Sequence, residues 1–465
     1  MGIVDENRGI HQADSPVESL EQTIAAVEGI GRELNAVTSV MGDRARTLAR
    51  KSAERSSAGE PSRNLEGVAF AIKDVIDVAG FPTTMGSKVS SGLDPSTSAP
   101  VVSLLERDGA LPVVKTNCQE YSYGILGDES AFGRVVNPVD PPLCTAGSSS
   151  GSAALVAAGV VPLALGTDTA GSVRVPAVCQ GVIGFKPTFG VVSTEGVFPL
   201  SPSFDTVGLF ARDLPLLTTA FAAIAGDGRV ADQPTERGAD NGGQDDDGGG
   251  SVQTKQPLTV DLSLLESAGE SAEGTRRWVD RALTEVRTTS ARSEELSEVI
   301  ERLSGIYDIV RRYEAYVLHQ QFAEEQGELY QPGVWAKIMS GQTITEAEYQ
   351  EQIVALEELR ASAASIFDDV DFLLTPAIEG EVIRWDEIGP DSAARFMRYS
   401  MPFNVLGWPA VTLPIGASAQ GTGAEETESA RPEPARPESV QIVGRPHNDE
   451  GLLAFAARLS SAAGL

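Results

Sequence analysis

Three short segments of the sequence contain the residue types that a covalent hydrolase needs. Lys73 ends the apolar part of AFAIKDVIDV, four serines lie in CTAGSSSGSAALVAAG (144–159), and Ser172 follows the turn in LALGTDTAGSVRVP. A serine hydroxyl becomes a nucleophile when a neighbouring base accepts its proton. A lysine amine can be that base where burial lowers its pKa. We therefore interpret the three segments together, as parts of one site.

The lysine at position 73 is informative because lysine is rare in this chain. There are 7 lysines and 29 arginines. A guanidinium stays protonated, whereas a buried amine can become neutral and accept a proton. Retention of lysine here indicates a need that arginine cannot meet. The alternative is a lysine at a strand end that extends its amine to water.

A second pairing of nucleophile and base is also compatible with the sequence. Residues 147–151 match G-x-S-x-G, the nucleophile elbow of Ser-His-Asp hydrolases, with Ser149 at the centre. That chemistry needs a histidine beside the serine, and the candidates are His319 and His447. His447 falls in the polar turn RPHNDE, which favours the lysine-based arrangement over this one.

The bulk composition describes a globular and strongly acidic chain. It has 465 residues, 41% hydrophobic content and a formal net charge of −30. This charge argues against binding to a nucleic-acid backbone. Many carboxylates with few lysines are typical of a salt-adapted, halophilic cytoplasmic protein, in which salt screens self-repulsion. No apolar run could span a bilayer and the first residues lack a secretory pattern, so we expect a cytoplasmic protein without membrane contact.

The sequence does not indicate a metal or an organic cofactor. Cys118, Cys144 and Cys179 are too few and too scattered for a disulfide framework or a zinc ribbon, and we expect them to be small buried residues. The three histidines have no metal-ligand spacing. We therefore expect no metal site and no cofactor.

The elements that position the three segments alternate between helices and apolar strands. Residues 16–58 have helical periodicity, and an apolar, β-branched strand is expected within 65–79. A helix followed by a strand is predicted in 99–117, in 150–168 and, in shorter form, in 178–188. This alternation is typical of an α/β protein with a largely buried sheet.

The domain organisation follows from the same patterns. Residues 1–60 are expected to form an N-terminal helical segment that packs on the core, and residues 61–465 to form the main domain. Polar, low-complexity segments at about 227–256 and 418–439 lie between apolar segments. We predict that both are solvated insertions within one domain.

Together, these segments resemble the amidase signature family. The family core is similar to G-G-S-S-G-G-S, then G-S-D-T-G-G-S-I-R, then G-x-K-P-T. This chain has AGSSSGS at 146–152, GTDTAGSVR at 166–174 and GFKPT at 184–188, and its IKD, VKTN and PFNVLGWPAVTLPIG segments match as well. The resemblance runs from about residue 60 to the end. It implies a single large α/β domain with a mixed, mostly buried central β-sheet covered by helices on both faces.

The resemblance implies a Ser–cis-Ser–Lys triad. Ser172 would be the nucleophile, Ser148 the bridging serine on a cis peptide bond, and Lys73 the base. Neutral Lys73 would accept a proton from Ser148, which would take one from Ser172 as it attacks the carbonyl. The oxyanion would be held by backbone N–H groups of the turn, those of Thr169, Ala170, Gly171 and Ser172. Polar residues expected to support this arrangement are Ser149, Asp168 and Arg174.

The chain departs from the family pattern at three positions. Ala146, Ser150 and Ala170 stand where the family has glycine. An alanine at position 170 requires that the nucleophile turn tolerate a Cβ atom. The resulting variant is similar to that of allophanate-hydrolase-like members of the family.

The resemblance implies an amidase that hydrolyses a linear carboxamide to a carboxylate and ammonia or amine through a seryl acyl-enzyme. A small-molecule amide would be its partner, and a homodimer is compatible with the sequence. The alternatives are the glutaminase-type subunit of a tRNA-dependent amidotransferase, an allophanate- or urea-type amidohydrolase, and an inactive homologue. The pocket for the acyl group is expected in the less characteristic region around residues 300–400.

Overall fold

Eleven strands form one mixed sheet in the computed structural model, which describes residues 16–89, 94–225, 258–268, 273–283, 286–418 and 436–463. The strand order is β1-β3-β2-β4-β6-β5-β10-β11-β9-β7-β8. In chain order the strands are β1 (Val37–Val40), β2 (Ala69–Lys73), β3 (Leu111–Thr116), β4 (Leu163–Asp168), β5 (Ile183–Lys186), β6 (Thr206–Ala211), β7 (Thr259–Asp261), β8 (Arg287–Thr289), β9 (Phe372–Pro376), β10 (Ala410–Ser418) and β11 (Arg436–Gly444).

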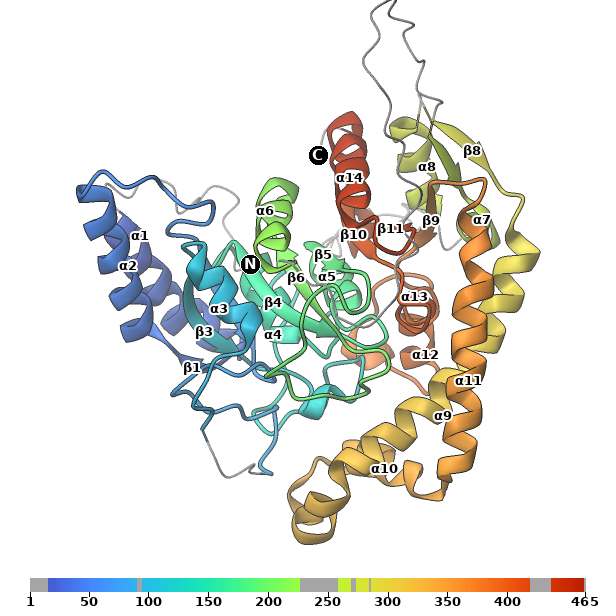
Figure 1. Ribbon diagram of the computed structural model, residues 1–465, viewed down its shortest axis with the longest axis horizontal. Coiled ribbons are helices and arrows are strands. Elements are labelled where there is room, and N and C mark those ends of the chain that lie inside the picture. Colours follow the sequence, from blue (N-terminus) through green and yellow to red (C-terminus); the bar gives the residue numbers. More distant parts are fainter. Residues whose placement is uncertain are drawn as a thin grey trace, which may run out of the picture.

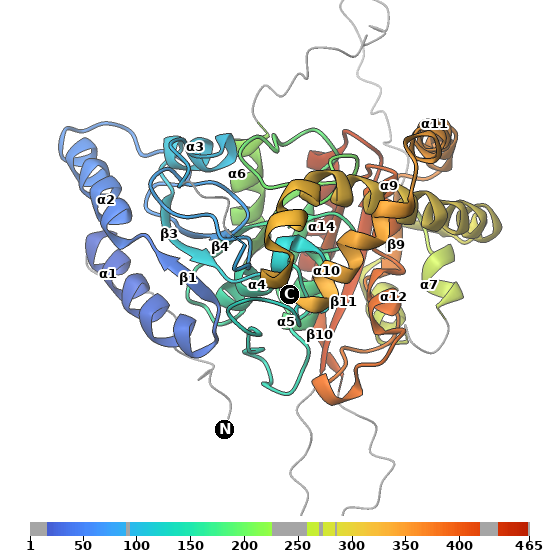
Figure 2. The ribbon, with the colours of Figure 1, turned by 90° about the horizontal axis from the view of Figure 1, so that it is seen from below.

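Helices flank the sheet and cover its ends (Figure 1). They are α1 (Pro16–Ala26), α2 (Gly42–Ser57), α3 (Pro100–Arg107), α4 (Ser150–Ala157), α5 (Arg174–Gln180), α6 (Leu214–Ile224), α7 (Ser263–Ser267), α8 (Glu273–Ala282), α9 (Ser293–Gln326), α10 (Pro332–Met339), α11 (Glu346–Ala363), α12 (Ser392–Met397), α13 (Met401–Val405) and α14 (Asp449–Ala463). Helices α1 and α2 lie beside the β1 end, and α9 and α11 lie at the opposite end of the molecule (Figures 1 and 2).

The alternation of side chains along β2 explains why both faces of the sheet are covered. Phe70 and Ile72 belong to a core cluster with residues of α3, α6 and α14, whereas Ala69 and Ala71 belong to a second cluster with residues of α4 and α5. Successive residues of a strand point to opposite faces, so a strand that is buried throughout needs helices on both. The predicted α/β architecture is therefore confirmed.

The predicted order of elements is right in the central region and wrong at one place near the N-terminus. The three predicted helix–strand units correspond to α3–β3, α4–β4 and α5–β5. Within 16–58, which we predicted to be helical, residues 37–40 instead form β1, which pairs antiparallel with β3. A strand of four residues is too short to show a period, and its partner in the sheet lies more than 70 residues further along the chain.

The N-terminal helices contact the core, and the predicted insertions fall largely outside the described residues. Side chains of α1 and α2, including Leu20 and Ala45, lie in the same cluster as residues of α4. The segment predicted as an insertion at about 227–256 lies outside the described residues. Residues 419–435 of the second predicted insertion also lie outside the described residues. Its residues 436–439 belong to β11 and not to a solvated loop.

A buried ion pair joins the C-terminal ends of β2 and β3. Lys115 Nζ lies 2.9 Å from Asp74 Oδ1, and both side chains are fully buried. The ammonium also donates to the carbonyl of Pro82 and to Thr83 Oγ1, each at 2.8 Å. Because Asp74 directly follows Lys73, this pair anchors the strand end that carries the candidate base.

We predict that Lys115→Met lowers the free energy of unfolding by about 3 kcal/mol or more, because it leaves the Asp74 carboxylate buried without its counterion. Denaturant unfolding followed by circular dichroism measures this change. Arg32→Met, which removes an exposed pair with Glu28, is the control and should have a much smaller effect. The double variant Asp74→Asn/Lys115→Met should recover part of the loss. Equal losses for Lys115→Met and Arg32→Met would contradict the prediction.

Candidate active site

The sheet brings the three sequence segments together at the carboxyl-terminal ends of two neighbouring strands. Lys73 is the last residue of β2, and the turn 169–172 follows β4 directly. Strands β2 and β4 are parallel neighbours, so their carboxyl ends lie side by side. Ser148 lies in the loop that leads into α4, the helix that packs against both strands. The convergence predicted from the sequence is thus a consequence of strand order.

Lys73 contacts Ser148 inside the protein. Lys73 Nζ lies 2.6 Å from Ser148 Oγ and 2.6 Å from Thr167 Oγ1, and the lysine is fully buried. Burial lowers the pKa of Lys73 to about 8, although the negative charges of Asp205 and Asp168 oppose the shift. An amine with this pKa is partly neutral in mildly alkaline solution and can accept a proton from the serine hydroxyl.

The loop that carries Ser148 is held by backbone contacts. The Gly147–Ser148 peptide bond is cis, as the resemblance implied. The Ser148 carbonyl accepts a hydrogen bond from the backbone N–H of Gln119 at 3.0 Å, and the N–H of Ser149 donates to the Ser172 carbonyl at 3.3 Å. The latter bond places the turn that carries Ser172 directly beside Ser148 and Ser149.

Asp168 orders the turn that carries Ser172 through backbone N–H groups. Its carboxylate accepts from Gly171 at 2.7 Å, from Val173 at 3.1 Å and from Arg174 at 3.3 Å. Burial by itself would raise the pKa of Asp168, but the Arg174 guanidinium and these hydrogen bonds hold it well below its usual range. At Gly171 the structure differs from the prediction, because its N–H is already bound to Asp168 instead of being available to an oxyanion.

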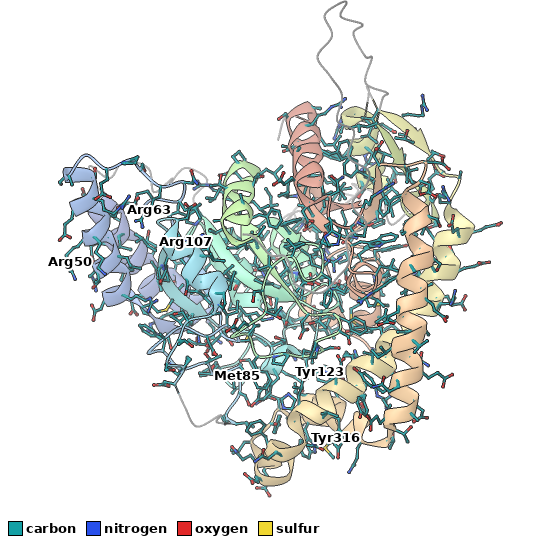
Figure 3. The ribbon with its side chains drawn as sticks, viewed as in Figure 1. Arg50, Arg63, Met85, Arg107, Tyr123 and Tyr316 are labelled. Carbon is teal, nitrogen blue, oxygen red and sulfur yellow. The ribbon has the colours of Figure 1, made fainter. Side chains whose placement is uncertain are left out.

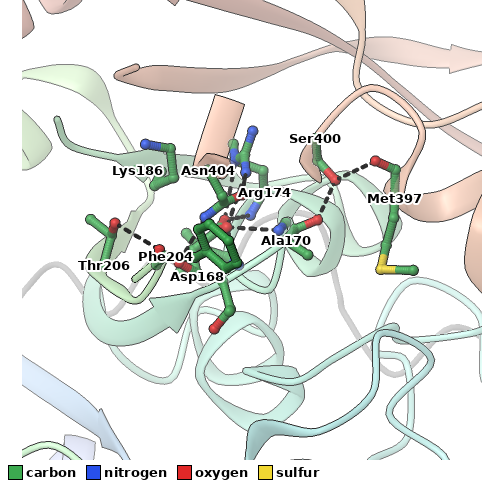
Figure 4. Close-up of polar contacts among 12 residues, drawn as sticks. Asp168, Ala170, Arg174, Lys186, Phe204, Thr206, Met397, Ser400 and Asn404 are labelled. Carbon is green, nitrogen blue, oxygen red and sulfur yellow. Dashed lines mark hydrogen bonds and ion pairs between the residues drawn. The ribbon is translucent and has the colours of Figure 1, made fainter. Parts of the chain in front are cut away.

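Arg174 connects the turn to the C-terminal half of the chain. The guanidinium is fully buried, forms an ion pair with Asp168 at 3.0 Å and donates to Gln441 Oε1 at 2.8 Å. It also donates to Asn404 Oδ1, and Asn404 Nδ2 donates to the Asp168 carbonyl at 2.8 Å (Figure 4). Asp168 thus binds the turn directly, and Arg174 binds Asp168.

Sequence reasoning missed three residues that support this turn. Ser400 Oγ donates to the Ala170 carbonyl at 2.6 Å (Figure 4), and Asn404 and Gln441 bind Arg174. All three are polar residues inside apolar segments of α13, β11 or their flanks, and all are nearly or fully buried. An uncompensated polar residue in an apolar run is the signal that could have indicated them.

A cavity of about 240 Å³ reaches the turn at Thr169, Ala170 and Ser172. Tyr307, Arg311, Lys337 and Met397 also line it, so residues of the region 300–400, where the acyl pocket was expected, contribute to this cavity. Tyr123, labelled in Figure 3, lies between the sheet and helices α9 and α10. A larger cavity of about 850 Å³ shares Tyr307, Arg311 and Met397 with this inner one.

The histidine-based arrangement is not assembled. Ser149 Oγ is bound to the backbone of Thr167, donating to its carbonyl and accepting from its N–H, each at 3.3 Å. His319 Nδ1 lies 2.9 Å from the hydroxyl of Tyr330, within a cluster of aromatic rings. The backbone N–H of His447 donates to Thr188 Oγ1. None of the hydrogen bonds among the described residues joins Ser149 to an imidazole.

The cysteines are buried, as predicted. Cys118, Cys144 and Cys179 are free and buried, and burial raises the pKa of Cys118 and of Cys144 to about 12, so both are protonated thiols. Within the described ranges, no group of three or more His, Cys, Asp or Glu side chains could hold a metal ion. No helix in the same ranges is long and apolar enough to cross a membrane.

The fold, with a buried lysine–serine contact at the edge of its mixed sheet, is that of an α/β amidohydrolase. A crystal structure of an amidase superposes with a TM-score of 0.77 at 28% identity and covers 96% of both chains. A structure that concerns the evolutionary origins of an s-triazine catabolic enzyme gives 0.80 at 25% identity, over 97% of this chain and 96% of that one. A glutamyl-tRNA(Gln) amidotransferase subunit of Symbiobacterium thermophilum is 30% identical over 95% of this chain and 92% of its own length.

The chain belongs to the amidase signature family, because the family model described as Amidase matches residues 18–453.

In the turn that carries Ser172, two neighbouring positions differ in whether they accept a Cβ atom. Ala170 has no left-handed backbone angle and belongs to the same core cluster as Phe204 and Met401, so the replacement of a family glycine is accommodated. Gly171 has a φ of +122°, and a Cβ atom there would collide with Ser400 Oγ. A Cβ atom is thus tolerated at position 170, where the family has glycine, and is excluded at position 171.

We predict that Gly171→Ala lowers kcat at least about 100-fold, because the Cβ atom displaces the turn that holds Ser172. Ala170→Gly should stay within about threefold of the wild type, and it serves as the matched control. Initial rates of ammonia release and thermal unfolding should both be measured for the two variants. A fully active Gly171→Ala variant would contradict this account of the turn.

Proposed function

We propose that the protein hydrolyses a linear carboxamide to a carboxylate and ammonia or amine through an acyl-enzyme on Ser172. The observation that carries the proposal is the 2.6 Å contact between the fully buried Lys73 Nζ and Ser148 Oγ. Ser172 lines the adjacent cavity and is tied to the Ser148 loop through its carbonyl. A base, a relay hydroxyl and an accessible nucleophile are the parts that acyl transfer needs.

Acylation uses the three groups as a proton relay. Neutral Lys73 accepts the proton of Ser148 Oγ, Ser148 accepts the proton of Ser172 Oγ, and Ser172 Oγ bonds to the amide carbon. The negative oxygen is held by backbone N–H groups of Thr169, Ala170 and Ser172. When the C–N bond breaks, the proton returns through Ser148 to the departing nitrogen.

Deacylation repeats the relay with water as the nucleophile. Water gives a proton to the relay and its oxygen bonds to the acyl carbon. The bond from that carbon to Ser172 Oγ then breaks, Ser172 regains its proton, and a carboxylic acid is released that ionises in solution. Asp168 and Arg174 take no proton in this scheme and keep the turn in place.

The setting of the proposed reaction follows from the composition. We propose a salt-rich cytoplasm, in which screening offsets the net charge of −30, and a small neutral or charged amide as the substrate. The same charge argues against direct contact with nucleic acid. No organic cofactor or metal enters the scheme, and a homodimer is compatible with it.

A second candidate is the glutaminase-type subunit of a tRNA-dependent amidotransferase. The observation that favours it is the similarity, over nearly the whole chain, to subunits of glutamyl-tRNA(Gln) amidotransferases. The two functions are separated by assaying the purified chain with simple aliphatic amides and with glutamine. Turnover of simple amides by the chain alone supports the amidase. Ammonia release from glutamine only, and only with added partner subunits, supports the second candidate.

We predict that Ser172→Ala and Lys73→Ala each lower kcat/KM at least about 1000-fold, because residues that act as a unit lose nearly everything together. An amide-directed phosphonate should form its covalent adduct on Ser172, which peptide mass spectrometry locates. Ser149→Ala should still form that adduct. An adduct on Ser149 would overturn the assignment.

We predict that kcat/KM rises about tenfold per pH unit below about pH 8 and levels off above it. The relay needs neutral Lys73, whose pKa is about 8, so protonation at lower pH removes the base. His319 cannot cause this inflection, because burial lowers its pKa to about 4 and it is neutral throughout. Lys73→Arg should be inactive at every pH, since the guanidinium stays protonated. A profile that is flat from about pH 6 to about pH 9 would contradict the assignment of the base.

A further inference from the structure

Among the charged residues that line the inner cavity, Arg311 of α9 is the most deeply placed. Its side chain is 17% exposed, against 41% for Lys337, and Asp128 is exposed. Much of the remaining wall is apolar and includes Ile125, Leu200 and Met397. Arg311 therefore presents a positive charge to a small and largely apolar space that also contains the proposed nucleophile.

Two aromatic rings fix the position of this guanidinium. Arg311 Cζ lies 5.3 Å from the centre of the Tyr123 ring and 4.7 Å from that of the Tyr307 ring. Both tyrosines line the same cavity, and one comes from the loop after β3 while the other precedes Arg311 by one turn of α9. Contacts between a cation and ring faces stabilise the charge.

The charge and the donors of Arg311 are only partly compensated. Its Nη2 donates to Asp308 at 3.0 Å, but the half-exposed Asp308 carboxylate also accepts from Arg312 Nη1 at 2.9 Å. Two guanidinium groups thus share one carboxylate. The Arg311 Nε–H is buried and, within the described part of the chain, has no hydrogen-bond acceptor. A buried donor without an acceptor is costly, so the protein groups around Arg311 do not fully satisfy its guanidinium.

We propose that Arg311 selects amides that carry a carboxylate at the end remote from the scissile bond, that is, monoamides of short dicarboxylic acids. The proposal rests on the proposed function, because it takes the turn 169–172 as the position of the reacting amide. The carboxylate pairs with the planar guanidinium, and the methylene groups between the two ends contact the apolar wall. A cavity of about 240 Å³ suits a substrate of this size and not a bulky one.

The positive charge of Arg311 is opposite in sign to the net charge of the protein. A chain with a net charge of −30 repels an anionic substrate at long range. A partly desolvated guanidinium inside the cavity acts at short range, where the solvent screens it least. Arg311 also lines the outer cavity of about 850 Å³, so an incoming carboxylate meets it at the boundary between the two spaces.

The test compares succinamate with succinamide and glutaramate with glutaramide, pairs of equal length that differ in the carboxylate. The full-length wild type should have the higher kcat/KM for the anionic member of at least one pair. Arg311→Met should reduce the anionic-to-neutral ratio at least about 30-fold, the loss expected for a charged hydrogen bond. Arg398→Met is the matched control, because Arg398 lines only the outer cavity and is 60% exposed, and its ratio should stay within about twofold of the wild type.

Two further variants make the test independent of a folding defect. Arg311→Lys keeps the charge but loses the planar pair of donors, so its ratio should lie between those of the wild type and Arg311→Met. Asp308→Asn removes the carboxylate that competes for Arg311, so its ratio should rise a few-fold above the wild type. Equal losses on anionic and neutral amides in Arg311→Met, or a change in Arg398→Met as large as that in Arg311→Met, would overturn the proposal.

Binding measurements separate this proposal from the proposed function. The same four compounds are titrated calorimetrically into Ser172→Ala and into Ser172→Ala/Arg311→Met. Tighter binding of the carboxylates in the first protein, lost in the second, supports the subsite even if the wild type hydrolyses none of them, in which case only the proposed reaction on these amides fails. The absence of any preference for carboxylates in Ser172→Ala overturns the subsite, whatever the rates are.

Discussion

The chemistry proposed for this protein depends on a lysine amine that is removed from water and placed against a serine hydroxyl. Lys73 is fully buried, and its contact with Ser148 is 2.6 Å long. Burial disfavours the charged form and lowers the pKa of Lys73 to about 8. Lys73 is buried because it is the last residue of β2, a strand that is buried along its whole length. One buried strand therefore supplies both part of the core of the sheet and the proposed base.

The turn beside Lys73 is held by a buried group that stays charged, the carboxylate of Asp168. Asp168 is equally buried, but it stays ionised because Arg174 and three backbone N–H groups surround its carboxylate. Arg174 then reaches Gln441 and Asn404, which lie more than 200 residues away along the chain. The site thus combines an amine that burial tends to neutralise with a carboxylate that pairing keeps charged. Local motifs supply both groups, and the C-terminal half of the chain keeps the second in place.

The sequence predicted the fold class, the central helix–strand units and the residues that meet at the sheet edge. It did so because buried strands are long apolar runs and because the motifs around Lys73, Ser148 and Ser172 are specific in combination. It failed at β1, whose four residues need a partner strand to define them. It also assigned the Gly171 N–H to an oxyanion, whereas the Asp168 side chain already accepts a hydrogen bond from it. The first error concerns a pairing with a distant strand, whereas the second concerns a side-chain-to-backbone hydrogen bond that spans only three residues.

Residue types and spacing by themselves therefore determined the family and the alternation of helices and strands. They also singled out Lys73, a lysine among apolar residues in a chain that otherwise prefers arginine. The family resemblance already named Ser148 as the partner of Lys73. Only the tertiary structure decided how the two neighbouring serines are bonded: Ser148 contacts Lys73, whereas Ser149, at the centre of the G-x-S-x-G pattern, binds the backbone of Thr167. It also brought Arg311, from a helix with no recognisable motif, to the cavity at Ser172. The physical reason is that a hydrogen bond depends on the direction of each side chain within about an ångström, and packing between distant segments sets that direction.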